Sequence, residues 1–182
     1  MHPGKPTIKG IFVNSHINAL RQLKGDEGIN ELANRFGKIP VFKNSDNVPI
    51  SDEVKIIEIC LDLMSDRKIP EIERSCEAGR LHFRNFSKTP LGRIIFSVFR
   101  NNFKLLMMQT KYLAGHVFHG VKFTSEDLGN NTIKVVMKNN DYPIDHFKGL
   151  FSEWMAFSGL KGTIDTRQLP PNTYEYIMKW ND

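Results

Sequence analysis

The segment FKLLMMQTKYLAG, residues 103–115, decides the fold, because its apolar side chains cover nearly every direction of a helix. A helix that is apolar almost all round is typical of a protein interior. After Gly115 the pattern changes. Residues 117–123 (VFHGVKF) and 132–137 (TIKVVM) are typical of strands, and Gly129-Asn130-Asn131 between them is typical of a turn. We therefore expect a buried central helix followed by a hairpin.

The C-terminal third continues this pattern with one helix and two more strands. Pro143 opens a helix whose apolar positions recur until Gly159, which is a typical helix stop. Residues 160–166 and 174–180 are then predicted strands on either side of Pro170-Pro171-Asn172. The order strand-strand-helix-strand-strand predicts a compact antiparallel sheet with one helix laid across it.

The segment before residue 103 is predominantly helical. One helix is predicted over residues 16–23, with a break at Gly25 and a new start at Asp26. Ser51-Asp52-Glu53 is a good helix start, with two acids that would face the positive end of the helix dipole. We expect an α+β protein in which a helical subdomain, 7–115, packs on a ββαββ subdomain, 116–182, after a flexible arm, 1–6. Together they form one integrated domain.

Composition sets the broad class. The chain has 182 residues, a formal charge of +5 and 40% hydrophobic residues. Cys60 and Cys76 are too few for a disulfide framework. No apolar run approaches the ~20 residues of a membrane-spanning helix, and residues 1–10 hold no secretory signal. We expect a soluble, cytoplasmic protein.

The positive charge is concentrated between Arg67 and Lys111, where ten Lys/Arg face three Asp/Glu. Arg80, Arg84 and Lys88 are four residues apart and would form one helical stripe. Such a stripe can bind a protein partner with an acidic surface. Alternatively, it is a solvated face paired with neighbouring glutamates. Nucleic-acid binding would need a larger charge excess and exposed aromatic side chains, so we do not expect it.

Motifs for catalysis and metal binding are missing. The sequence has no Gly-rich phosphate loop, nucleophile elbow, Cys-x-x-Cys or His-Glu-x-x-His. We therefore expect no enzyme and no catalytic residue. His116 and His119 are three residues apart, but along a strand their side chains would point to opposite faces. We expect no metal site.

Several short motifs together resemble the haem-nitric-oxide/oxygen-binding (H-NOX) domain, whose superfamily includes four-vinyl-reductase-type domains and TRAPP subunits. They are Lys9-Gly10-Ile11, Leu20-Arg21-Gln22-Leu23, Asp52-Glu53-Val54, Glu77-Ala78-Gly79-Arg80, Leu106-Met107-Met108 and Phe147-Lys148-Gly149-Leu150. Three further motifs resemble an uncharacterised family with many paralogues in myxobacteria and related predatory or gliding bacteria. These are Leu81-His82-Phe83-Arg84-Asn85-Phe86, Phe103-Lys104-Leu105 and Asn139-Asn140-Asp141-Tyr142-Pro143.

The resemblance implies an H-NOX-like fold with a cofactor site between the helical part and the sheet. A haem-binding member has an axial histidine where this sequence has Tyr112. Its Tyr-x-Ser-x-Arg motif, which binds the propionates, corresponds here to Met137, Asn139 and Asp141. A carboxylate in place of the arginine would repel a propionate. We expect no haem and no other cofactor, with haem ligated by Tyr112 as a further alternative.

Two hypotheses follow. The first is a non-catalytic sensory or protein-interaction module in bacterial intracellular signalling, with the basic stripe for its partner. The second is a carrier or sensor of an apolar ligand, such as an acyl chain, between the subdomains. Candidate cavity residues are Phe103, Met107, Met108, Tyr112 and Phe151, which otherwise simply fill the core. The polar junction Asn139, Asn140 and Asp141 either caps the next helix through Asp141 or binds a polar ligand. The sequence leaves open whether the chain forms a homo-oligomer.

Overall fold

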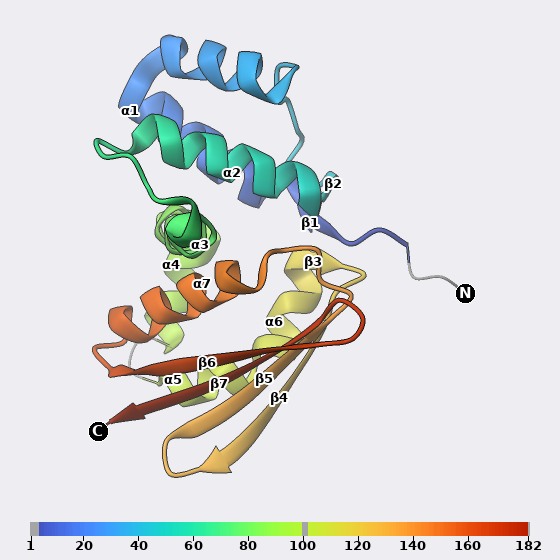
Figure 1. Ribbon diagram of the computed structural model, residues 1–182, viewed down its shortest axis with the longest axis vertical. Helices are drawn as coiled ribbons and strands as arrows, with labels where there is room; N and C mark the ends of the chain where they lie inside the picture. Colours follow the sequence, from blue (N-terminus) through green and yellow to red (C-terminus); the bar gives the residue numbers. More distant parts are fainter. Residues whose placement is uncertain (1–3, 100–101, 182) are drawn as a thin grey trace.

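A computed structural model describes residues 4–99 and 102–181, and residues 1–3 of the predicted arm lie outside that part. Figure 1 shows α1 (Gly10–Phe36) and α2 (Ile50–Met64) at one end of the molecule, a sheet at the other, and α3 (Glu71–Ser87) and α7 (Ile144–Phe157) between them. This sheet has four strands. The N-terminal part contains β1 (Thr7–Lys9), α1 (Gly10–Phe36), β2 (Asn47–Pro49), α2 (Ile50–Met64), α3 (Glu71–Ser87), α4 (Pro90–Phe99), α5 (Phe103–Met108) and α6 (Thr110–Val117). The described helices include none that is long and apolar enough to cross a membrane.

Helix α1 has a sharp bend at Gly25, whose φ of 62° and ψ of −155° are not helical. The predicted break at this residue is confirmed. The helix nevertheless begins at Gly10, before the predicted start at residue 16. Its first N–H groups need no side-chain cap, because Gly10 N donates to Asp46 O at 2.8 Å and Ile11 N donates to Asn44 O at 3.1 Å.

The C-terminal part contains β3 (Phe118–His119), β4 (Lys122–Gly129), β5 (Thr132–Lys138), α7 (Ile144–Phe157), β6 (Lys161–Leu169) and β7 (Thr173–Asn181). The large sheet has the order β4-β5-β7-β6, and every neighbouring pair is antiparallel. The predicted α+β class with a ββαββ unit is confirmed. A small sheet of order β2-β1-β3 joins the N-terminal segment to the chain that leads into the large sheet.

One face of the large sheet carries the core. Phe151 of α7 lies edge-on against Tyr176, and Phe103 of α5 lies edge-on against Trp180. Tyr176 and Trp180 point to the same side of β7, because side chains two or four residues apart in a strand share a face. Helices α5 and α7 therefore cover the same face of the sheet.

The predicted buried central helix is wrong in two respects. The segment forms two short helices that meet at Gln109, with φ of −90° and ψ of 1°. Its inward side chains are buried, but Leu105 is 45% exposed and Tyr112 is 68% exposed. The reason is that the segment packs on the sheet through one side only, and its outer side faces solvent.

Helices α3 and α7 approach each other through two glycines. A Cβ atom on Gly79 would lie 1.8 Å from the carbonyl oxygen of His146, and one on Gly149 would lie 1.9 Å from that of Cys76. Only glycine permits backbones to come this close. Each glycine lies about one helical turn from a buried imidazole. His82 is three residues after Gly79, and His146 is three residues before Gly149.

Candidate functional site

A set of buried polar side chains lies where α1, α2, α3 and α7 meet, and we call it the buried polar cluster. Every member is less than 5% exposed. The helices supply five members, and the loop between β5 and α7 supplies the sixth. The members are His16, Glu53, His82, Asn85, Tyr142 and His146.

The carboxylate of Glu53 is the centre of the cluster. Its Oε1 atom lies 2.9 Å from His16 Nε2 and 3.5 Å from His82 Nδ1. His82 Nδ1 also lies 3.2 Å from His146 Nε2, and Asn85 Nδ2 lies 3.2 Å from His16 Nδ1. Four helices are thus connected through the polar atoms of a few side chains.

Two further oxygen atoms of the cluster, Glu53 Oε2 and the Tyr142 hydroxyl, are inaccessible to solvent. Burial raises the pKa of Tyr142, and the neighbouring Glu53 carboxylate raises it further through its charge and through a side-chain hydrogen bond. Tyr142 therefore adds a hydroxyl group to the polar atoms around the Glu53 carboxylate.

Burial also determines the charge of the imidazoles. It lowers the pKa of His16 to about 3 and that of His82 to about 4, and it lowers the pKa of His146 well below the ordinary value. Burial raises the pKa of Glu53, while His82 acts in the opposite direction. At neutral pH the three imidazoles are therefore neutral, and each retains a nitrogen lone pair.

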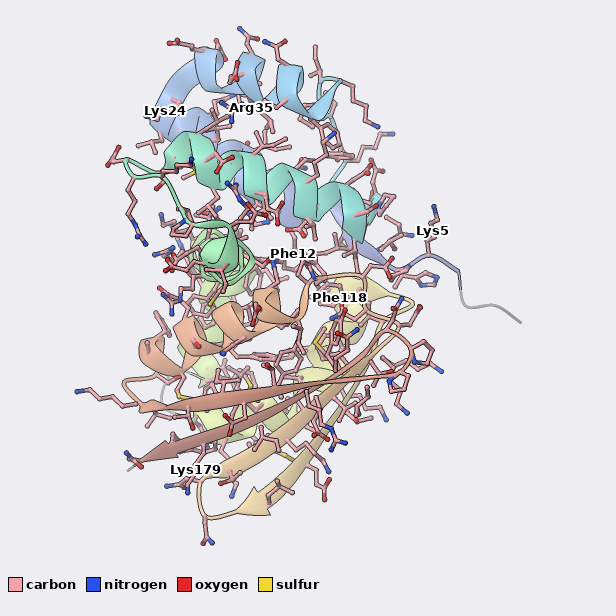
Figure 2. All side chains as sticks on the ribbon, in the orientation of Figure 1. Lys5, Phe12, Lys24, Arg35, Phe118 and Lys179 are labelled. Carbon is pink, nitrogen blue, oxygen red and sulfur yellow. The ribbon has the colours of Figure 1, made fainter. Side chains whose placement is uncertain are left out.

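An apolar cavity of about 80 Å³ lies beside the cluster, between the N-terminal helices and the ββαββ part. Figure 2 labels Phe12 and Phe118, two of its lining residues, at this junction. The lining is almost entirely apolar and comes from α1, α3, α4, α6, α7 and the strands after α6. His82 belongs to this lining and to the cluster, so it connects the two features.

The structure does not bring the five predicted cavity residues together. Phe151 lines the apolar cavity, whereas Phe103 and Met107 are buried and do not line it. Met108 and Tyr112 border a shallow hollow on the outer surface of α5 and α6. The sequence pattern identified apolar residues correctly but could not separate the cavity wall from the core and the surface.

The predicted basic stripe is partly neutralised within its own helix. Arg80 Nη1 lies 2.9 Å from Glu77 Oε1, and Arg84 Nη2 lies 3.9 Å from Glu77 Oε2. Lys88 is the C-cap residue of α3. The two arginines share one acidic side chain, so the stripe keeps excess positive charge. Its role in binding a partner stays a prediction.

The polar junction does not cap α7 as expected. The N-cap residue is Pro143, and no side chain caps the helix. Asp141 accepts a hydrogen bond from Asn172 Nδ2 at 3.4 Å, because it lies before the N-cap and beside the turn between β6 and β7. Asn140 is buried and its Oδ1 atom accepts from Tyr142 N at 3.1 Å, while Asn139 Nδ2 donates to Gly120 O. The junction therefore holds Tyr142 in place.

His116 and His119 are both exposed and lie in α6 and β3. Helix α6 continues to Val117, so the predicted stop at Gly115 is wrong. Within the residues that the structure describes, the one group of three side chains whose types and spacing could hold a metal ion is His16, Glu53 and His82.

The buried polar cluster was not predicted from the sequence. Its signal was a polar residue on an apolar helix face. Glu53 shares one side of α2 with Ile56, Ile57 and Cys60, all of them buried. The prediction that Glu53 is an acid in the first turn of a helix is confirmed. What this prediction did not include is that the side chain is fully buried against His16.

The residues described here do not fit a haem between the helical part and the sheet. The apolar cavity is far smaller than the ~300–1,000 Å³ of typical cofactor pockets. Tyr112, the candidate iron ligand, is 68% exposed and does not line the cavity. Asp141, which stands where a haem-binding member has the arginine, is exposed and has no positive charge with which to bind a propionate. The absence of haem stays a prediction.

Comparison with known proteins supports the fold. The chain is similar to an H-NOX protein from S. oneidensis in the Fe(II)NO ligation state, with a TM-score of 0.72 and 16% identity over 96% of this chain and 99% of that one. It is also similar to a mutant of T. Tengcongensis H-NOX (TM-score 0.61, 18% identity, 96% and 98% covered). A third similar structure is an oxygen-binding H-NOX domain related to soluble guanylate cyclases (TM-score 0.61, 17% identity, 96% and 95% covered). The chain therefore has an H-NOX-like fold.

At the level of sequence, residues 5–181 match a family described as "Protein of unknown function (DUF2378)". None of the curated proteins matches the chain. The predicted resemblance to TRAPP subunits, to four-vinyl-reductase-type domains and to a myxobacterial family stays a prediction.

Proposed function

We propose that this chain, which belongs to the DUF2378 family of proteins of unknown function, is a sensory module that binds a small apolar molecule in its apolar cavity. The supporting observation is the position of the cavity at the junction of the two parts of an H-NOX-like fold. The module acts by binding and by a change of shape, without catalysis, in intracellular signalling.

The volume of the cavity limits the ligand. A water molecule occupies about 30 Å³ of liquid, and an engineered apolar cavity of about 150 Å³ binds benzene or xenon. A cavity of about 80 Å³ therefore suits a molecule of a few heavy atoms. An acyl chain would require the helices to separate. For this reason we favour a sensor of a small molecule over the carrier hypothesis.

The lining elements suggest how occupancy is transmitted. Helix α3 contributes His82 and Phe83 to the cavity wall and carries Arg80 and Arg84 on its exposed side. A ligand that displaces the wall also displaces the basic stripe. His82 connects the same wall to Glu53, and thus to α1 and α2. The proposed output is altered binding of a protein partner with an acidic surface.

Xenon is a suitable probe for this cavity. We expect xenon pressure to shift the NMR signals of cavity residues such as Phe12 and Phe147. Ala114→Leu fills the cavity and should abolish these shifts, because Ala114 lines it. Ala156→Leu makes the same change at an exposed position of α7 and should leave them unchanged.

Two results would contradict the proposal. One is a wild-type protein whose cavity signals do not respond to xenon. The other is an equal response in the Ala114→Leu variant, because xenon would then bind elsewhere. Native mass spectrometry of the purified protein tests the haem alternative, since a bound haem would add its own mass. Charge reversal at Arg80 and Arg84 tests the output, and partner binding that survives it would exclude the stripe.

A further inference from the structure

The geometry points to a second site beyond the proposed sensor function: we propose that the buried polar cluster binds a divalent transition-metal ion through His16, Glu53 and His82. The three side chains come from α1, α2 and α3. Their ligand atoms all lie within 4.8 Å of one another. An ion at this point would therefore connect three helices.

The distances suit a coordination sphere with little adjustment. Zinc binds histidine nitrogen and carboxylate oxygen at about 2.0–2.2 Å, so two ligand atoms of a tetrahedral site are about 3.4 Å apart. Glu53 Oε1 lies 2.9 Å from His16 Nε2 and 3.5 Å from His82 Nδ1. The nitrogens of His16 and His82 lie within 4.8 Å of each other, so rotation of these side chains would have to bring the three atoms to this spacing around an ion.

The surroundings supply the outer partners that a metal site needs. A metal-bound histidine usually donates its second N–H group to a neighbouring acceptor. Asn85 lies 3.2 Å from His16 Nδ1, on the side of the ring away from Glu53. Because the oxygen and nitrogen of a side-chain amide are interchangeable by rotation, Asn85 can accept this proton. His146 Nε2 lies 3.2 Å from His82 Nδ1 and is a further polar neighbour of this ligand atom.

The charge balance favours a cation. Glu53 is fully buried, and no lysine or arginine belongs to the cluster. Buried carboxylates are normally paired with a cation or coordinate a metal. Two imidazoles and one carboxylate, without a thiolate, suit zinc, iron, copper or nickel better than calcium or magnesium, which prefer oxygen ligands.

The test measures metal content in the full chain without a histidine tag. We expect the purified wild type to hold close to one zinc or iron ion per chain by elemental mass spectrometry. Protein unfolded with chelator and refolded with Co²⁺ should show the visible absorption of a Co²⁺ site. Glu53→Gln and His82→Gln should lose both signals. His116→Gln, which removes an exposed imidazole outside the cluster, should retain them.

A second variant keeps the test decisive if the ligand variants fail to fold. Asn85→Leu leaves all three ligands in place and should lower the Co²⁺ affinity about 10- to 100-fold, as expected for an outer partner. The proposal is overturned if the wild type contains no metal and if neither Zn²⁺ nor Co²⁺ added during refolding raises its unfolding temperature. Equal metal content in the wild type and in a folded Glu53→Gln variant would also overturn it, because the ion would then lie elsewhere. The cluster would in either case be a neutral hydrogen-bonded network.

Discussion

Replacing Gly79 by alanine tests whether the close approach of α3 and α7 supports the fold. The added Cβ atom would lie 1.8 Å from the carbonyl oxygen of His146, whereas real Cβ atoms essentially never come closer than 3.0 Å. The two helix backbones must therefore move apart by about 1.2 Å at this point. The obstructing atoms belong to the backbone, so no side-chain rotation can relieve the contact.

The cost follows from the rigidity of both helices. Overpacking a well-packed core typically costs about 1–3 kcal/mol. Because the helices must separate along their contact, we expect Gly79→Ala to lower the free energy of unfolding by about 3 kcal/mol. In a domain of this length each kcal/mol lowers the unfolding temperature by about 2–4 °C, so we expect a decrease of about 6–12 °C. Gly149→Ala should lower the free energy of unfolding less in the Gly79→Ala variant than in the wild type, because the helices have already separated in that variant.

Thermal unfolding followed by circular dichroism measures the effect. Gly115→Ala in α6 is the matched control, since its Cβ atom meets nothing within 4 Å. That variant should gain up to about 1 kcal/mol from the better helix propensity of alanine. The reasoning is refuted if Gly79→Ala unfolds at the wild-type temperature while Gly115→Ala behaves as expected.

Three further predictions concern other parts of the chain. Phe103→Ala should destabilise the protein by about 3–5 kcal/mol in denaturant unfolding, because Phe103 is 2% exposed. The variant should still take up xenon, because Phe103 does not line the cavity. A variant of wild-type stability would contradict this prediction. Burial raises the pKa of Cys60 to about 12. Iodoacetamide should therefore modify the half-buried Cys76 first and Cys60 only after unfolding. Equal rates of modification of the two thiols, measured by mass spectrometry, would be inconsistent with the burial of Cys60. Lys104 Nζ lies 2.7 Å from Asp127 Oδ2 and lowers the pKa of that carboxyl group. Lys104→Gln should therefore raise the pKa of Asp127 in an NMR titration. An unchanged pKa would show that the ion pair does not form in solution.

Features encoded within a few residues were predictable from the sequence. Gly129, Asn130 and Asn131 all have positive φ angles, as the turn between β4 and β5 requires. Gly25 interrupts α1, and Gly159 ends α7 with a φ of 77°. Each depends on the conformational preference of the residue itself, and local sequence therefore reveals it.

Features that depend on packing against another element of the fold were not predictable from local sequence. Ile72 and Phe83 are spaced so that they lie on the same side of α3, yet Ile72 is 88% exposed, whereas Phe83 is buried. The apolar period gives the side of a helix but not the part that another element covers. Glu53 had a sufficient local explanation as an acid at a helix start, and its contact with His16, 37 residues away in sequence, has no local signature.

The glycine contact between α3 and α7 also limits how the molecule can move. Each glycine is seated against a carbonyl of the other helix, so sliding or rotation of one helix along the other would drive backbone atoms together. The two helices are therefore locked together and move as one body. A displacement of α3 relative to α1 and α2 would carry both α7 and the basic stripe with it. The contact of His82 with Glu53, 3.5 Å between Nδ1 and Oε1, lies where this body meets α2.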